Sequence, residues 1–242
     1  MTSTVISKET IHRLIKDVKQ IIKNPLIDNG IYYCHDDEDL LKGYALIIGP
    51  EDTPYFGGYY FFEFHYPPDY PYSPPKVIFS TNNGTVRFNP NLYKCGKVCV
   101  SILNTWSGDK WTSCQTINSI LLTLCSLLNK EPLLNEPGQK NDSRDFNSYH
   151  KVIEYYNIDF AICDLLHKEK IPPQFIGFYP FMKEHFVKKY EKLLQFVQDK
   201  RIENPDKVLY KVYLYSMDVS VNYSNLLNKL IETKTFVDTY TT

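Results

Sequence analysis

A cysteine in an irregular segment is the residue of this chain best suited to covalent chemistry. Cys99 follows Gly96, Lys97 and Val98, within a stretch from 82 to 110 that shows no helical or strand periodicity. Long irregular segments of compact domains often carry function, and a large partner could reach a thiol placed there. A thiolate is both a good nucleophile and a good leaving group. Cys99 could therefore carry an activated acyl group as a thioester.

Three other roles are open to this cysteine. A free cysteine is commonly a buried structural residue. Cys95 and Cys99 form a C-x3-C pair that could be half of a zinc site, but no second pair lies at ligand spacing. None of the six histidines falls within a few residues of Cys99, which disfavours a Cys-His hydrolase. The sequence around Cys99 is needed to distinguish between these roles.

The elements that would position Cys99 can be predicted from periodicity. Apolar residues at helical spacing, with Ser7 and Glu9 at the start, predict a capped helix over 7–23. Segments rich in Tyr, Phe and Ile predict strands over 43–48, 58–66 and 76–80. Five prolines between 66 and 75 predict an extended loop, since proline cannot donate to a sheet ladder. A helix over 115–128, apolar around much of its circumference, is expected to be the core helix.

The pattern changes beyond Pro137-Gly138. A helical rhythm runs through 142–168, resumes over 175–199 after Pro172-Pro173, and is plausible again over 221–231. Strands early and helices late predict an α+β fold with a helical C-terminal extension. The expected organisation is a catalytic core over 1–150 and an extension over 151–242.

Composition narrows the classes of protein and partner. A chain of 242 residues with 43% hydrophobic residues can fill a sizeable core. A net charge of −1 gives no global positive field, so a nucleic-acid partner is not expected. No apolar run approaches the ~20 residues that span a bilayer, and no secretory leader is evident, so no membrane association is expected. Sparse cysteines fit free thiols in a reducing compartment, cytoplasmic or nuclear.

Several motifs of the middle of the chain occur together in one family. In order, they read PYFGG at 54–58, YPPDYPYSPP at 66–75, NPN at 89–91, a cysteine eight residues after Asn91, KWTSC before the core helix, and NEPG at 135–138. In this order and spacing, residues 8 to 150 resemble a ubiquitin-conjugating enzyme. The resemblance implies a fold with an N-terminal helix, a four-stranded antiparallel meander and a central helix.

The resemblance also implies an activity. Cys99 would accept the C-terminal carboxyl of ubiquitin, or of a ubiquitin-like modifier, from an activating enzyme, and would transfer it to a substrate lysine or to a ligase. No metal or organic cofactor of its own is implied, because the activating enzyme uses the ATP. The alternative is a catalytically silent, ubiquitin-binding variant of the same fold; such variants lack the acceptor cysteine.

Site residues carry over at matching positions. Asn91 would donate to the oxyanion of the tetrahedral intermediate or hold the loop beside it. Tyr93 would wall the channel for the incoming lysine. Glu136, preceded by Asn135, would form an acidic gate that orients or helps to deprotonate the attacking amine.

Partner surfaces carry over in the same way. The polar face of the first helix would dock the activating enzyme through His12, Arg13, Lys16 and Lys19. The ligase-facing surface would contain Tyr66, Ser113 and Cys114, which differ from the residues of well-known members, so ordinary ligases are not assumed to bind there.

Two departures place the chain within the family. Asn89 replaces a mainly structural histidine and is expected to be a turn residue beside Pro90. The segment 100–110 is longer than in short members and contains an extra Trp106. Both features resemble the long-loop group typified by ubiquitin-conjugating enzyme Z.

Overall fold

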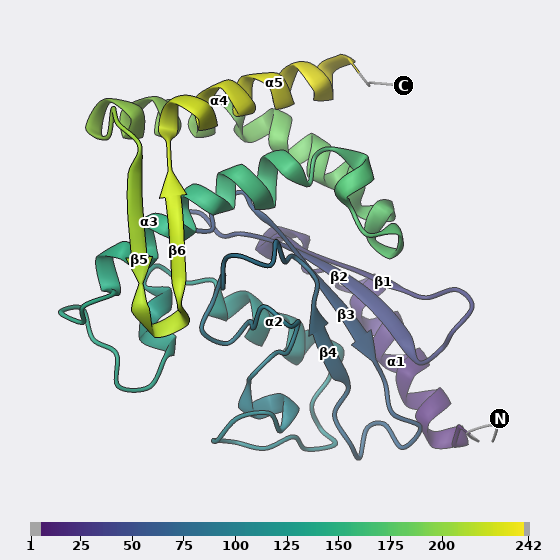
Figure 1. The fold of residues 1–242 in the computed structure, drawn as a ribbon. Helices are drawn as coiled ribbons and strands as arrows, with labels where there is room; N and C mark the ends of the chain where they lie inside the picture. Colours follow the sequence, from purple (N-terminus) through teal and green to yellow (C-terminus); the bar gives the residue numbers. More distant parts are fainter. Residues whose placement is uncertain (1–5, 240–242) are drawn as a thin grey trace.

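A computed structural model describes residues 6–239 and shows an α+β fold, as the sequence predicts (Figure 1). Four antiparallel strands form a meander in the order β1-β2-β3-β4. The strands are β1 Ile31–His35, β2 Lys42–Ile48, β3 Tyr59–His65 and β4 Lys76–Phe79. Helix α1 (Lys8–Lys23) and helix α2 (Ile117–Leu127) belong to the core. The N-terminal helix, the meander and the central helix are confirmed.

Local chemistry explains where the two core helices begin. The side chain of Ser7 accepts from the Thr10 N–H at the start of α1. At the start of α2, Thr116 and Ser119 each bond the backbone N–H of the other, which forms a capping box. Both caps satisfy N–H groups that have no partner within the helix.

The sheet is buried on both faces because apolar residues continue through its central strands. Ala45 and Ile47 of β2 pack in a core with α1 and α2, whereas Leu46 and Ile48 face the opposite way. This second face packs against residues of the C-terminal extension. Strand side chains alternate between faces, so a run of apolar residues indicates two covered faces.

The extension is mainly helical. It contains α3 Phe146–Tyr156, the π-helical segment η4 Asn157–Asp164, η6 Pro173–Phe178, α4 Tyr179–Glu203 and α5 Tyr223–Thr239. Figure 1 shows α3, α4 and α5 on one side of the sheet and α2 on the other. Short 3-10 helices punctuate the chain at η1 Ile27–Asn29, η2 Ser101–Leu103, η3 Pro132–Asn135, η5 Lys168–Lys170 and η7 Tyr213–Tyr215.

The extension also contains a hairpin that the sequence analysis did not predict. Strand β5 (Val208–Val212) pairs with β6 (Met217–Val221), and η7 lies in the turn between them. Along β6, Met217, Val219 and Val221 are buried and alternate with polar residues. This period of two is the strand signal that the helical interpretation of the tail overlooked.

The chain around residue 150, where the core is expected to end, is helical. The boundary expected there falls inside α3, which continues without a break to Tyr156. The Tyr59 hydroxyl donates to the Met182 carbonyl at 2.7 Å, and the Tyr60 hydroxyl donates to Asn157 Oδ1 at 2.6 Å. The outer ends of the two expected ranges, residues 1–5 and 240–242, lie outside the described residues. Within 6–239 the two parts share packed interiors.

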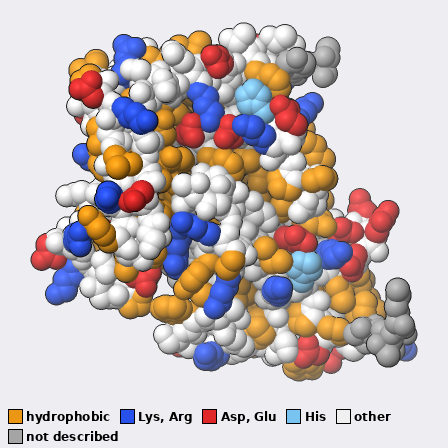
Figure 2. All heavy atoms as spheres, viewed as in Figure 1, with side chains coloured by type: hydrophobic (Ala, Val, Ile, Leu, Met, Phe, Trp, Pro, Cys, Tyr) orange, Lys and Arg blue, Asp and Glu red, His pale blue; other side chains and the backbone are white. Residues whose placement is uncertain are grey.

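Two surface properties bear on partners. Acidic and basic side chains are interspersed on the face shown in Figure 2, and hydrophobic side chains reach the surface between the extension and the rest of the molecule. Across residues 6–239, no helix has the length and apolar character needed to cross a bilayer.

Candidate active site

A short irregular ladder holds the predicted acceptor cysteine. The Cys99 N–H donates to the Asn91 carbonyl at 2.9 Å, and the Tyr93 N–H donates to the Lys97 carbonyl at 2.9 Å. Between these pairs, Leu92 bridges Val98, and both side chains are buried. Alternation then places Asn91, Tyr93 and Cys99 together on the opposite side of the ladder.

Gly96 makes the turn of this ladder possible. Its φ of +85° lies in the left-handed region, and its N–H donates to the Tyr93 carbonyl at 2.9 Å. A side chain at this position would be strained, because residues with a Cβ rarely adopt positive φ. The turn sets the register that brings Cys99 opposite Asn91.

Asn91 contacts the backbone of the cysteine directly. Its Nδ2 donates to the Cys99 carbonyl at 2.7 Å, and its N–H donates to Asn89 Oδ1 at 2.9 Å. The Asn91 Oδ1 atom is buried and has no hydrogen-bond partner among the described residues. Of the two roles expected for Asn91, this contact is the loop-holding one.

Asn89 forms a buried support behind the ladder. Its side chain is fully buried, and Nδ2 donates to the Tyr55 hydroxyl at 2.9 Å and to the Leu127 carbonyl at 2.8 Å. These bonds tie the Asn-Pro-Asn turn to the end of α2. A structural role for Asn89 agrees with its expected role as a turn residue.

Asn135 belongs to the same support. Its Nδ2 donates to the Leu127 carbonyl at 3.1 Å, and its Oδ1 accepts from Asn129 Nδ2 at 2.8 Å. A longer contact of 3.5 Å runs to Asn89 Oδ1. These bonds give Asn135 the role of anchoring the gate loop, residues 129–137, to the end of α2.

Glu136 is engaged by a residue of the extension. The Tyr215 hydroxyl, in the turn of the β5–β6 hairpin, donates to Glu136 Oε2 at 2.7 Å. The Arg87 guanidinium lies 3.7 Å from the Tyr93 ring centroid and 4.5 Å from that of Tyr215. Sequence reasoning missed both Arg87 and Tyr215. Arg87 lies two residues before Asn89 and could have been considered; nothing in the sequence links Tyr215 to this site.

The predicted acceptor cysteine is less open than the sequence suggests. Cys99 exposes only 2% of its surface, although an accessible thiol is expected from its irregular segment. The long segment that follows closes onto the next residue: the Thr105 hydroxyl accepts from the Val100 N–H at 2.9 Å and donates to the Val100 carbonyl at 3.0 Å. In this arrangement the thiol is covered, and a partner has to displace part of its surroundings.

Three of the four residues expected to dock an activating enzyme are exposed. His12, Lys16 and Lys19 lie on the outer face of α1. Arg13 does not: its Nε bonds the buried Asp17 at 3.0 Å and its Nη1 donates to the Ser113 carbonyl at 2.6 Å. Arg13 therefore fastens α1 to the loop before α2, and its guanidinium is occupied within the fold.

The expected ligase-facing surface needs one correction. Tyr66 is 3% exposed, and its hydroxyl lies 2.9 Å from that of Tyr33, so its assignment to an exposed surface is wrong. The reason is that its ring packs within the core, 6.1 Å from the ring of Phe64 and 5.3 Å from that of Tyr70. Tyr72, in that loop, is 63% exposed, and Ser113 and Cys114 are exposed as expected.

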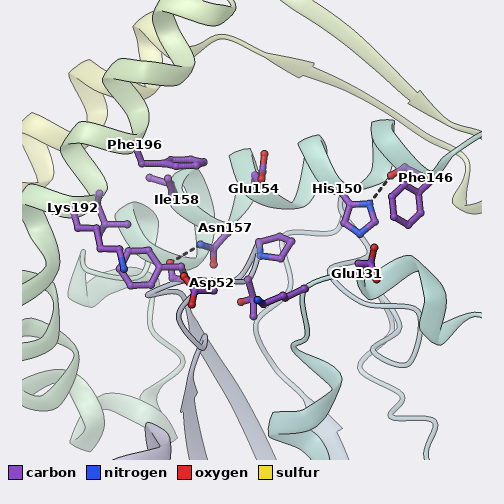
Figure 3. A pocket seen from close by; sticks show the side chains of 14 residues that line it. Asp52, Glu131, Phe146, His150, Glu154, Asn157, Ile158, Lys192 and Phe196 are labelled. Atoms are coloured by element: carbon purple, nitrogen blue, oxygen red, sulfur yellow. Dashed lines mark hydrogen bonds between the residues drawn. The ribbon is translucent and has the colours of Figure 1, made fainter. Parts of the chain in front are cut away.

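A cavity of about 500 Å³ opens between the core and the extension (Figure 3). Its walls include Phe56 and Phe196, together with His150 and Glu154 of α3. Burial lowers the pKa of His150 and raises the pKa of Glu154, which favours the uncharged form of each. His150 Nδ1 is 2.7 Å from the Phe146 carbonyl, whereas its buried Nε2 has no partner among the described residues.

No cluster of metal-ligating residues appears in the described part of the chain. Within residues 6–239, no group of three or more His, Cys, Asp or Glu side chains could hold a metal ion. The six cysteines, all within this range, are unpaired.

Comparisons with known proteins agree on one family. The family model described as "Ubiquitin-conjugating enzyme" matches residues 13–156. Ubiquitin-conjugating enzyme E2 Z of Xenopus tropicalis is 44% identical over 163 residues, which are 66% of this chain and 51% of the relative. The E2 Z of Danio rerio is 40% identical over 188 residues, 76% of this chain and 56% of the relative.

The likeness continues into the extension. The 188 residues aligned with the Danio rerio protein exceed the 150 expected for the core. A probable ubiquitin-conjugating enzyme of Acanthamoeba polyphaga mimivirus is 34% identical over 217 residues, 84% of this chain and 15% of the relative. The chain spans about half the length of the E2 Z relatives it matches. Because the family model matches more than half of the chain, the protein belongs to the ubiquitin-conjugating enzyme family.

Proposed function

We propose that this chain accepts ubiquitin, or a ubiquitin-like modifier, as a thioester on Cys99 and transfers it to a substrate lysine or to a ligase. The observation that carries the proposal is the ladder within the family-matched region, where Asn91 bonds both the N–H and, through its side chain, the carbonyl of Cys99. These bonds fix the backbone of Cys99 relative to the Asn-Pro-Asn turn.

Loading is an exchange between two sulfur atoms. The Cys99 thiolate attacks the carbonyl carbon of the thioester on the activating enzyme. A new carbon–sulfur bond forms, the old one breaks, and the activating enzyme's cysteine leaves as a thiolate. The proton that Cys99 releases is matched by the proton that this leaving thiolate takes up. The energy of the bond comes from ATP spent earlier by the activating enzyme, so this chain needs no cofactor of its own.

Unloading forms an amide. The lysine amine attacks the thioester carbonyl carbon, the intermediate carries its negative charge on oxygen, and the carbon–sulfur bond then breaks. The amine loses one proton and the Cys99 sulfur leaves as a thiolate, which a proton restores to the thiol. Glu136 and Tyr93 are the residues that would orient the amine and line its path. Transfer to a ligase cysteine repeats the exchange used in loading.

Two surfaces would receive partners. The exposed face of α1 carries His12, Lys16 and Lys19 and would meet the activating enzyme. Tyr72, with Ser113 and Cys114, forms the exposed surface that a ligase would meet. Free thiols and a thioester chemistry fit a reducing compartment such as the cytoplasm or nucleus.

A charging assay tests the proposal. The protein is incubated with ubiquitin, activating enzyme and ATP, and the products are separated on a non-reducing gel. A reductant-sensitive adduct is expected for the wild type and for Cys95→Ala, a neighbouring exposed cysteine, but not for Cys99→Ala. Cys99→Ser should give a more stable oxyester. An adduct that survives Cys99→Ala would contradict the assignment of the acceptor, and no adduct at all would favour the silent, ubiquitin-binding alternative.

A further inference from the structure

The turn of the β5–β6 hairpin is fixed against the catalytic core. We call residues 213–216 the hairpin tip. The Leu214 N–H donates to Oδ2 of the buried Asp145 at 2.7 Å, and the Tyr215 ring packs 5.5 Å from the ring of Tyr149. These contacts come from α3 and the residue before it. The tip, although distant in sequence, therefore has a defined position beside the gate loop.

From this position Tyr215 donates to the gate carboxylate. Its hydroxyl lies 2.7 Å from Glu136 Oε2. Burial and the Glu136 carboxylate raise the pKa of Tyr215 above its ordinary value, so the phenol stays protonated and remains a donor. A bond to one carboxylate oxygen fixes the rotation of the group and leaves Oε1 to meet an incoming amine. A short hydrogen bond to a charged acceptor is among the stronger kinds.

Tyr215 also packs against Arg87, the side chain that lies on the ring of Tyr93. The Arg87 guanidinium lies between the rings of Tyr93 and Tyr215, at 3.7 and 4.5 Å from their centroids. It also donates to the Pro90 carbonyl, in the Asn-Pro-Asn turn. The Arg87 N–H lies 3.2 Å from the Met217 sulfur of β6. One residue of the extension thus touches the gate directly and the channel residue Tyr93 through Arg87.

We propose that Tyr215 is a positioning residue for transfer to lysine, which holds the Glu136 carboxylate and the Arg87–Tyr93 pair at the path of the acceptor amine. The proposal rests on the proposed function of Cys99, since it concerns the unloading step. It assigns part of the acceptor channel to the C-terminal extension. Loading, which involves no acceptor amine, does not require the Tyr215 hydroxyl.

A two-step assay tests separately whether Cys99 is loaded and whether Tyr215 assists transfer to lysine. The full chain is first loaded with ubiquitin, the activating enzyme is then stopped by removing ATP, and unloading is followed with either free lysine or hydroxylamine. Tyr215→Phe keeps the ring that packs on Tyr149 and Arg87 and removes only the hydroxyl. We expect normal loading, a roughly tenfold slower reaction with lysine, and an unchanged reaction with hydroxylamine. Hydroxylamine is small and uncharged at neutral pH and so needs no carboxylate to orient or deprotonate it.

Matched variants complete the test. Tyr213→Phe, in the same tip but 55% exposed, should behave as the wild type. Glu136→Gln should slow lysine more than Tyr215→Phe does, and the double variant should be no slower than Glu136→Gln alone, because both act through one contact. Wild-type rates with lysine in Tyr215→Phe would overturn the proposal, as would equal slowing with lysine and hydroxylamine. Failure of the wild type to load would overturn the proposed function, and this proposal with it.

Discussion

The side-chain nitrogen of Asn91 lies 2.7 Å from the carbonyl oxygen of Cys99, and the Cys99 N–H donates to the Asn91 carbonyl at 2.9 Å. Asn91 therefore forms hydrogen bonds with both polar backbone groups of Cys99. A side-chain amide has two N–H donors, so the second can still serve an oxyanion that forms nearby. The Asn91 side chain can therefore both hold the loop at Cys99 and donate to the oxyanion of the tetrahedral intermediate.

Substituting Asn91 should slow transfer far more than loading. Asn91→Ala removes a donor whose loss typically costs about 10²–10³ in rate and also releases the Cys99 carbonyl. Asn91→Asp should be at least as slow, because a carboxylate oxygen would face that carbonyl. Unloading to lysine, measured in single turnover, checks both variants. Asn147→Ala, an exposed change on α3, is the control. A transfer rate within twofold of the wild type in Asn91→Ala would contradict the expectation.

Burial of Cys99 should protect its thiol from small reagents. In the folded protein, iodoacetamide should modify the exposed Cys95 and Cys114 at least roughly tenfold faster than the buried Cys99. Mass spectrometry of early time points gives the order of labelling, and denatured protein gives the unprotected rates. Labelling of Cys99 as fast as of Cys95 would show that the site is open in solution.

The Thr105 bonds predict how that protection can be weakened. Thr105→Val removes the hydroxyl that accepts from the Val100 N–H and donates to its carbonyl, next to Cys99. Labelling of Cys99 should become several-fold faster, because the long loop loses its attachment. Thr112→Val, an exposed threonine outside that attachment, should leave the rate unchanged. Equal rates in the wild type and Thr105→Val would show that the loop does not cover the thiol.

Asn157 should be a strong determinant of stability. It is buried, accepts from the Tyr60 hydroxyl at 2.6 Å and donates to the Phe56 carbonyl at 2.9 Å. Asn157→Ala leaves two polar groups unpaired and should lower the free energy of unfolding by about 2–3 kcal/mol. Urea denaturation measures the change, and Asn147→Ala should alter it by less than about 0.5 kcal/mol. If Asn157→Ala lowers the free energy of unfolding by less than about 0.5 kcal/mol, the packing between the core and the extension does not depend on this residue.

Acid should weaken the packing of α4 on the sheet at His185, whose ring lies 6.2 Å from that of Tyr59 in β3. Burial, then the Lys189 ammonium, lower the pKa of His185 from 6.5 to about 4, although Glu51 opposes the shift. The unfolded chain therefore binds this proton more readily than the folded chain between pH 6.5 and 4. The contribution of His185 is complete above about pH 6.5 and is lost as the pH falls toward 4. Allowing for solvent screening, the loss should be about 2 kcal/mol.

A paired measurement separates the contribution of this residue from those of the other groups that titrate as the pH falls. His185→Gln should show a smaller loss of unfolding free energy between pH 7 and pH 4.5 than the wild type shows. His12→Gln, on the exposed face of α1, should not change that loss. If the wild type and His185→Gln lose stability in parallel, the ring is not held uncharged in the fold.

Periodicity predicted the helices of the core and of the extension and three of the four strands of the meander, but it missed β1 and the β5–β6 hairpin. The spacing of Leu14, Val18 and Ile21 and the runs in β2 and β3 predict those elements well, because each buries a continuous face. The hairpin was missed because β5 and β6 are short and lie among helices. Segments of this length depend on tertiary packing more than on local preference.

Residue type was a weaker guide to exposure than to chemistry. Arg13 and Tyr66 were both expected to face a partner, yet each is engaged by groups far away in the sequence. Cys99 and Asn91 could be proposed as site residues because both lie in one short motif, eight positions apart. Tyr215 could not be found in this way, since its contact with Glu136 exists only after the hairpin packs on α3.

The sheet face that the extension covers is not available for binding partner proteins. Tyr59 and Phe61, which would be a flat aromatic platform on an open meander, lie beneath the chain's own helices. A second protein could reach them only by displacing α4, at the cost of re-exposing a packed interior. Partner proteins are therefore expected to bind elsewhere, at the edge of β1, on the outer face of α1 or at the loops around Cys99.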